Sequence, residues 1–259
     1  MIRFCANVGF LFTELPFRER FAAARAAGFD AVEFAWPHVA HDDLREAIAA
    51  ARVRVAQMNM DAGDLAAGER GWASHPDAVG RWRDAFQVAL DLAGELDCPR
   101  INVLAGNGLP GFGHEDMVRC LLDNLRWALP HAARHRVVLL LEVLNATDTP
   151  AYLFNDTASA TALLTHVDHP ALRLQFDTYH VASGGEQPAA RFRELAPLVG
   201  HVQVADFPGR HEPGTGTTDF DAFFAALAET GYGGAVGLEY VPSTDTRSSL
   251  GWLQRTQRR

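Results

Sequence analysis

Residues 137–177 read VVLLLEVLNATDTPAYLFNDTASATALLTHVDHPALRLQFD, and this stretch decides the fold. Two apolar runs rich in leucine and valine, 137–143 and 172–176, have the length and composition of buried strands. Between them, residues 157–167 have the alanine- and leucine-rich composition of a helix. A strand, a helix and a second strand in this order predict two parallel strands joined by a crossover helix.

The same alternation extends to both ends of the chain. We expect eight strands, at residues 2–8, 31–34, 53–58, 100–104, 137–143, 172–176, 201–205 and 235–240. Helices are expected at residues 17–27, 41–51, 77–95, 115–135, 157–167, 189–196 and 220–230, with a short one near Ser248. This pattern favours the α/β class and a closed (β/α)8 TIM barrel over an open sheet. A length of 259 residues suits one such barrel, so we expect a single domain over residues 1–259.

The charge and hydropathy of the chain restrict its partners. Its formal net charge is -9, which repels phosphate backbones and anionic lipid surfaces, so neither nucleic acid nor a membrane is expected as a partner. No apolar run approaches the roughly 18 to 20 residues of a membrane span. The three cysteines are far apart and form no CxxC motif. We therefore expect a soluble, cytoplasmic protein.

The chain contains no lysine, and all 23 basic residues are arginine. Schiff-base aldolases and pyridoxal-phosphate enzymes need a lysine amine as their covalent partner. A phosphate-binding P-loop needs a lysine as well. These three kinds of chemistry are therefore excluded.

Four of the expected strands reach a polar side chain near their C-terminal ends. The runs are LLLE at 139–142, LQFD at 174–177, HVQVAD at 201–206 and GLEY at 237–240. Because the strands of a barrel open on a common mouth at their C-terminal ends, we expect these side chains to converge there. Hard oxygen donors in this number favour Mg²⁺ or Mn²⁺ over zinc. The four candidate metal ligands are Glu142, Asp177, Gln203 and Glu239.

Each of these residues also has a simpler structural interpretation. A lone glutamate at a strand end is commonly an ion-pair partner or a helix cap. Gln203 can hydrogen-bond a neighbouring strand end. Taken together, however, several buried carboxylates without a cation would repel one another and raise their pKa values, so the set favours a bound dication. Residues 61–76, an irregular stretch after the third strand, are expected to form a lid.

Eight motifs together resemble the hydroxypyruvate isomerase family, within the xylose isomerase-like TIM barrel superfamily. They are Asn7, GFDAVE at 28–33, AGDLAAGERG at 62–71, EVLN at 142–145, DTYH at 177–180, QVAD at 203–206, EPGTG at 212–216 and GLEY at 237–240. The resemblance spans nearly the whole chain, and residues 62–71 are its most specific part. It implies that Glu142, Asp177, Gln203 and Glu239 bind a divalent metal ion and that Glu142 and Glu239 are the catalytic proton-transfer groups.

The resemblance also implies a reaction and a substrate site. The reaction interconverts hydroxypyruvate and tartronate semialdehyde (2-hydroxy-3-oxopropanoate) by proton transfer through a cis-enediolate. His180 and Arg210 match substrate-contacting residues of related ketose epimerases, and Asn7 is among the matched residues. Because the chain lacks lysine, we expect a substrate carboxylate to be bound by side chains from the group Arg70, Arg210, His211 and Asn59.

Two departures from the family leave the substrate open. Met58-Asn59 stands where relatives often have His-Asn, and residues 142–145 resemble ketose 3-epimerases and 2-oxo-tetronate isomerases equally well. Those activities are the alternatives, with a small hydroxy-keto acid or sugar as substrate. A non-catalytic binding protein and a metal-dependent endonuclease are less favoured, since the latter needs more histidines and a basic surface. A homo-oligomer is left open, because no sequence signal indicates one.

Overall fold

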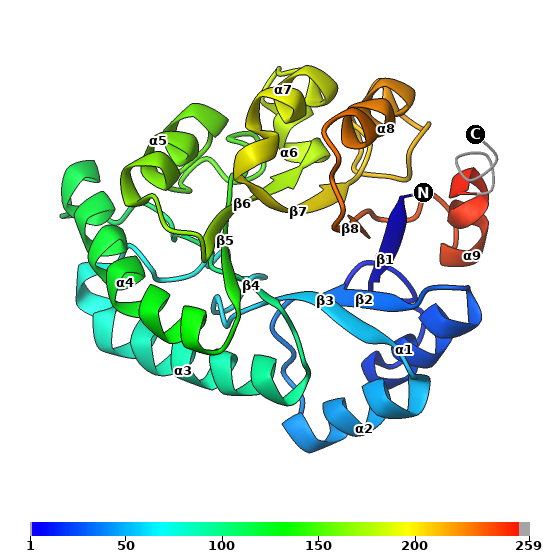
Figure 1. Ribbon diagram of the computed structural model, residues 1–259, viewed down its shortest axis with the longest axis horizontal. Helices are drawn as coiled ribbons and strands as arrows, with labels where there is room; N and C mark the ends of the chain where they lie inside the picture. The colour runs from blue at the N-terminus through cyan, green and yellow to red at the C-terminus, as the bar shows by residue number, and fades with distance from the viewer. Residues whose placement is uncertain (1, 254–259) are drawn as a thin grey trace.

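The computed structural model describes residues 2–253, and its eight parallel strands form a closed barrel. Each strand pairs with its neighbours in chain order, and β8 closes the barrel against β1 (Figure 1). The predicted fold class is therefore confirmed. The strands are β1 (Arg3–Asn7), β2 (Ala31–Phe34), β3 (Arg54–Asn59), β4 (Arg100–Asn102), β5 (Val138–Glu142), β6 (Leu172–Asp177), β7 (Val199–Val204) and β8 (Ala235–Leu238).

Helices cover the outside of the barrel (Figure 1). The long ones are α1 (Phe17–Ala26), α2 (His41–Ala51), α3 (Val79–Glu95), α4 (His114–Arg134), α5 (Thr157–Val167), α7 (Pro188–Leu195) and α8 (Phe220–Glu229). The short closing helix expected near Ser248 is α9 (Thr246–Ser249), and 3₁₀ turns lie at Pro76–Ala78, Ala196–Leu198 and Leu250–Trp252. Aromatic side chains pack between helices and strands, as where Phe176 of β6 meets Phe192 of α7 with ring centroids 5.3 Å apart.

One helix, α6 (Thr178–Ser183), was not expected from the sequence. It follows β6 without a loop, because the carboxylate of Asp177 ends the strand and caps the helix. Oδ1 of Asp177 accepts a hydrogen bond from the backbone N–H of Tyr179 at 2.8 Å. Six residues are too few to show a helical period, so the pattern could not predict this element.

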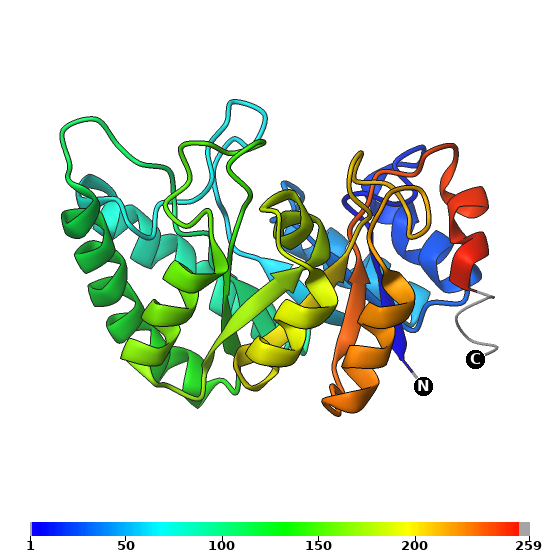
Figure 2. The same cartoon turned by 90° about the horizontal axis from the view of Figure 1, so that it is seen from above.

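The long loops lie at one end of the barrel (Figure 2). Those that follow β3, β4, β5 and β7 extend to the same side, which is the side of the strands' C-terminal ends. The expected lid, residues 61–76, lies in the first of these loops. Gly28 and Gly231, just after α1 and α8, have φ angles of +98° and +70°, the left-handed conformation that ends many helices.

Two features expected from the sequence, membrane spans and cysteines, can be examined in the described residues. Within residues 2–253, no helix combines the length and the apolar character that a membrane span requires. Cys5, Cys98 and Cys120 are free thiols. Buried polar side chains also line the interior of the barrel, among them Glu33, Gln57, Asn102, Gln175, His201 and Gln203.

Candidate active site

Glu142 and Asp177, two of the four candidate metal ligands, lie close together at the mouth of the barrel. They are the last residues of the neighbouring strands β5 and β6, and both are buried. A carboxylate oxygen of each lies within 4.8 Å of the other and of a ring nitrogen of His180. Burial and the charge of Asp177 raise the pKa of Glu142 to about 7, and burial also raises the pKa of Asp177. The pair therefore carries an electrostatic cost that a cation would remove.

Glu239, the residue after β8, contacts the same region through Arg210. Nη2 of Arg210 lies 3.1 Å from Oε2 of Glu239 and 3.6 Å from Oδ2 of Asp177. The guanidinium lies over the rings of Phe10 and Tyr179, 4.9 and 5.0 Å from their centroids. Burial raises the pKa of Glu239 well above its ordinary value in spite of this arginine. Three predicted carboxylates are thus gathered around one guanidinium.

The carboxylates fit a hard divalent cation. Oδ2 of Asp177 is buried and has no hydrogen-bond partner among the residues that the structure describes. Glu142 and Asp177 are close enough together for their carboxylates to hold one metal ion. An orphaned carboxylate oxygen beside a second buried carboxylate is the donor chemistry that Mg²⁺ and Mn²⁺ prefer.

Gln203 is placed next to this group in the barrel wall, but its amide is hydrogen-bonded deeper in the interior. Its Cα pairs with that of Asp177 across β6 and β7. Nε2 donates to Oε1 of Glu33 at 2.7 Å, and Oε1 accepts from Nε2 of Gln175 at 2.8 Å. The alternative role considered for Gln203, a hydrogen bond to neighbouring strands, is the arrangement seen here.

His180 presents a hydrogen-bond donor rather than a lone pair to the carboxylates. Its Nδ1 accepts from the backbone N–H of Asn145 at 3.0 Å, so the ring proton lies on Nε2. Nε2 is 3.6 Å from Oδ2 of Asp177. Burial, followed by the charges of Arg210 and Arg70, lowers the pKa of His180 well below its usual value. The ring is therefore a neutral donor at the mouth.

The other residues predicted to bind substrate have different hydrogen-bond partners, and one of them contacts the carboxylate group. Asn7 contacts the carboxylate group, since its Nδ2 donates to Oε1 of Glu239 at 3.1 Å. Arg70 donates to the backbone oxygens of Leu65 and Glu69 within the lid. Asn59 accepts from Gln57 at 2.7 Å. His211 lies 2.8 Å from the oxygen of Val241, beside the mouth.

The EPGTG motif at 212–216 holds the loop that carries Arg210. The carboxylate of Asp206 accepts four backbone N–H groups, those of Phe207, Gly214, Gly216 and Thr218, at 2.8 to 3.0 Å. A Cβ at Gly216 would collide with Phe207, which explains the glycine. Residues 207–218 are thus folded around the carboxylate of Asp206, with two of the four amides from the motif, and Arg210 lies in this loop.

Sequence reasoning missed two residues of the site. Nδ2 of Asn102 in β4 donates to Oε2 of Glu142 at 2.6 Å, and this bond lowers the pKa of Glu142. Glu33 binds both Gln203 and Asn7 from below. Asn102 could have been found as another polar residue at a strand end. Glu33 lies inside a motif that the resemblance had already marked.

Comparison with known proteins agrees with this barrel fold. Residues 21–256 match the model of the xylose isomerase-like TIM barrel family. Hydroxypyruvate isomerase of Escherichia coli (strain K12) is 35% identical over 254 residues, which cover 98% of both chains. 2-Oxo-tetronate isomerase of Cupriavidus necator is 37% identical over 258 residues, again 98% of both chains.

A solved structure matches the whole barrel closely. The crystal structure of an AP endonuclease, family 2, from Brucella melitensis superposes with a TM-score of 0.94, at 33% identity over 98% of this chain and 99% of that one. The chain belongs to the xylose isomerase-like TIM barrel family. Its relatives of known name indicate more narrowly that it is an isomerase, of the kind that hydroxypyruvate and 2-oxo-tetronate isomerases represent.

Proposed function

We propose that the protein is a divalent-metal-dependent isomerase that interconverts hydroxypyruvate and tartronate semialdehyde. The observation that supports it most is the pair of glutamates at the mouth, Glu142, which is buried, and Glu239, which is partly buried, gathered there with Asp177. Both glutamates have a raised pKa. A glutamate beside the reacting carbon of the substrate can act as a general base and take its proton. The similarity to hydroxypyruvate isomerase of Escherichia coli supplies the substrate class.

Glu142, Asp177, Gln203 and Glu239 would hold the ion, which is Mg²⁺ or Mn²⁺ in this proposal. For Gln203 this requires Oε1 to leave Gln175, whereas Nε2 can stay on Glu33. When bound, such an ion polarises a substrate carbonyl and acidifies the neighbouring C–H. The oxygen-rich donor set and the orphaned Oδ2 of Asp177 support this assignment.

The chain's own residues would move the proton and orient the substrate. One glutamate takes the proton from C3, the hydroxyl-bearing carbon of hydroxypyruvate, and a proton is returned to the adjacent carbon, C2. The hydroxyl proton passes from the oxygen on C3 to the oxygen on C2, so that C3 becomes the aldehyde and C2 bears the hydroxyl, with the same atoms. Nε2–H of His180 can donate to a substrate oxygen as negative charge develops on it. Arg210 and Arg70 supply positive charge for the substrate carboxylate.

2-Oxo-tetronate isomerisation is the second candidate, and the 37% identity to the enzyme of Cupriavidus necator favours it. The two activities require the same proton transfer on acids of different length. Assays of the purified protein, treated with chelator and reloaded with Mn²⁺ or Mg²⁺, should compare hydroxypyruvate, 2-oxo-tetronates and simple ketoses. Proton NMR in D₂O would report both product and exchange of the substrate proton.

The expected result is metal-dependent conversion of hydroxypyruvate with deuterium entering the product. A higher kcat/KM for the oxo-tetronates would transfer the proposal to them, and turnover of ketoses alone would identify an epimerase. Binding without exchange would indicate a non-catalytic protein. Metal-dependent nicking of DNA at an abasic site, without hydroxypyruvate turnover, would establish the endonuclease instead.

A further inference from the structure

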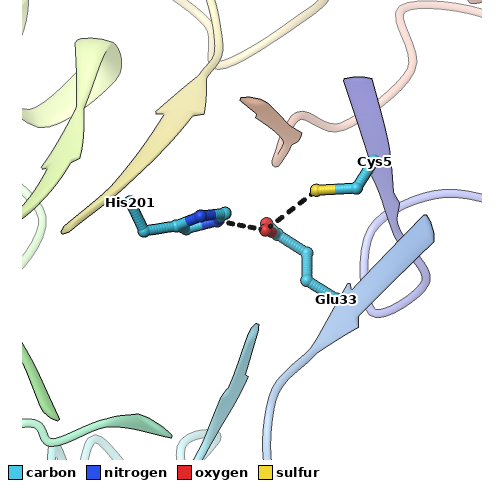
Figure 3. Close-up of side chains that lie close together, drawn as sticks. All are labelled: Cys5, Glu33 and His201. Carbon is cyan, nitrogen blue, oxygen red and sulfur yellow. Dashed lines mark hydrogen bonds and ion pairs between the residues drawn. The ribbon is translucent and has the colours of Figure 1, made fainter. Parts of the chain in front are cut away.

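The proposed reaction assigns no role to Glu33, although its carboxylate is fully buried in the centre of the barrel. Figure 3 shows the side chains of Cys5, Glu33 and His201, from β1, β2 and β7, pointing toward one another. Nε2 of His201 lies 2.5 Å from Oε2 of Glu33, and Sγ of Cys5 lies 3.4 Å from the same oxygen. An acidic side chain in this position needs such partners to offset its desolvation.

The barrel leaves space for this carboxylate at one position. Gly237 lies in β8, where its Cα pairs with those of Cys5 and Gln203 on either side. A Cβ on Gly237 would overlap both carboxylate oxygens of Glu33. Gly237 of the GLEY motif therefore leaves the space that Glu33 of the GFDAVE motif fills.

The second oxygen of Glu33 faces the candidate active site. Oε1 accepts from Nε2 of Gln203 at 2.7 Å and from Nδ2 of Asn7 at 3.1 Å. An ionised carboxylate only accepts hydrogen bonds, so both amides must turn their N–H groups toward it. The oxygen of each amide is consequently directed elsewhere.

The orientation that Glu33 imposes on the amide of Gln203 also orients further amides in the interior. With Nε2 of Gln203 held by Glu33, its Oε1 accepts from Nε2 of Gln175 at 2.8 Å. Oε1 of Gln175 in turn accepts from Nε2 of Gln57 at 3.2 Å. On the other branch, Nδ2 of Asn7 also donates to Oε1 of Glu239 at 3.1 Å.

We propose that Glu33 is a positioning residue that fixes the amide orientations of Gln203 and Asn7. Gln203 then offers its oxygen, the atom that a cation would bind, and Asn7 holds Glu239 in place. This inference rests on the proposed function for the roles of Gln203 and Glu239. Outer partners of this kind orient metal ligands, and losing one typically weakens metal binding by about 10- to 100-fold.

A metal ion bound by Cys5, Glu33 and His201 themselves is the competing explanation, since their ligand atoms lie within 4.8 Å of one another. The geometry favours a hydrogen-bonded anchor instead. Two ligands that are each about 2 Å from a shared zinc ion stand further apart than the 2.5 Å between His201 and Glu33. Burial also raises the pKa of the Cys5 thiol well above its ordinary value, which opposes the thiolate that a metal needs.

The test measures Mn²⁺ binding to chelator-treated protein by EPR, together with kcat and KM for hydroxypyruvate. Glu33→Gln replaces a carboxylate, which only accepts hydrogen bonds, by a carboxamide that can also donate, so it no longer fixes the two amides. Gly237→Ala keeps the carboxylate but displaces it. Cys5→Ala is the matched control, because it removes a contact to Oε2 and leaves Oε1 untouched. The melting temperature of each variant is measured first, so that binding is compared only between folded proteins.

We expect Glu33→Gln and Gly237→Ala to weaken Mn²⁺ binding by about 10-fold or more, and Cys5→Ala to stay within twofold of the unchanged protein. Unchanged Mn²⁺ affinity and kcat in either folded variant would overturn the positioning role. Two bound ions in the unchanged protein and one in Cys5→Ala would overturn it as well, and would establish the competing site. An unchanged protein that turns over hydroxypyruvate without any metal would refute the metal-dependent function itself.

Discussion

Nη2 of Arg210 lies 3.1 Å from Oε2 of Glu239, so a cation of the chain itself already neutralises part of the carboxylate group. The same nitrogen is 3.6 Å from Asp177. Arg210 therefore competes with any metal ion for these carboxylates, and it can also bind an anionic substrate. The two roles predict opposite effects of its removal.

Arg210→Ala should strengthen Mn²⁺ binding to the substrate-free protein and raise KM for hydroxypyruvate by about 10- to 100-fold, because a charge-assisted hydrogen bond is lost. Calorimetry with Mn²⁺ and steady-state kinetics measure the two effects. Arg45→Ala, which removes an exposed ion pair with Asp42 and Glu95 on the helical layer, should change neither. Weaker metal binding with an unchanged KM would contradict both roles of Arg210.

Arg70 should contribute to binding of the substrate carboxylate from the lid. Its charge helps to lower the pKa of His180, so its field reaches the mouth. Arg70→Ala should raise KM for hydroxypyruvate by about 10-fold but change KM for a neutral ketose little. Side-by-side kinetics with the two substrates decide the matter, and equal effects on both would remove Arg70 from the anion site.

The raised pKa of Glu142 should make the metal-free protein less stable at higher pH. Burial, aided by Asp177, moves this pKa from 4.5 to about 7. Between those values the folded chain holds a proton that the unfolded chain has lost, so the free energy of unfolding falls as pH rises through this window and levels off above it. Glu142→Gln removes the dependence.

Melting temperatures measured in chelator from pH 5 to pH 8 test this titration. The advantage of Glu142→Gln over the unchanged protein should grow as pH rises, since the variant has no carboxylate to ionise at this position. Comparing the two proteins at each pH cancels the other titrating groups. A difference that stays constant across the range would show that Glu142 titrates normally.

Asn102→Ala should impair catalysis through Glu142. The bond from Nδ2 to Oε2, 2.6 Å long, favours the charged carboxylate, so its loss should raise the pKa of Glu142 further. We expect kcat/KM to fall by about 10- to 100-fold and the acidic limb of its pH profile to move to higher pH. Gln87→Ala, on the exposed face of α3, serves as control. A lower kcat/KM with an unmoved pH profile would assign Asn102 a purely structural role.

The barrel was predictable because each strand and each of the longer helices has its own local sequence pattern, whereas the six residues of α6 are too few to show one. The mainly apolar run at 137–143 is long enough to predict β5, and Glu142 within it marks the mouth. Local sequence patterns do not predict contacts across the barrel. Glu33 and Gln203 are 170 residues apart, and no local period relates them. The bond from Arg210 to Glu239 depends likewise on the loop that Asp206 holds.

The hydrogen bonds described above that join the mouth to Glu33 all run through carboxamides, those of Asn7 and Gln203. A carboxamide keeps its hydrogens near neutral pH and cannot relay a proton as a hydroxyl or an imidazole can. Protons are therefore not relayed from the mouth to Glu33 along these contacts. A hydrogen taken from a substrate carbon has no route downward along these contacts, so we expect it to exchange with solvent at the open mouth.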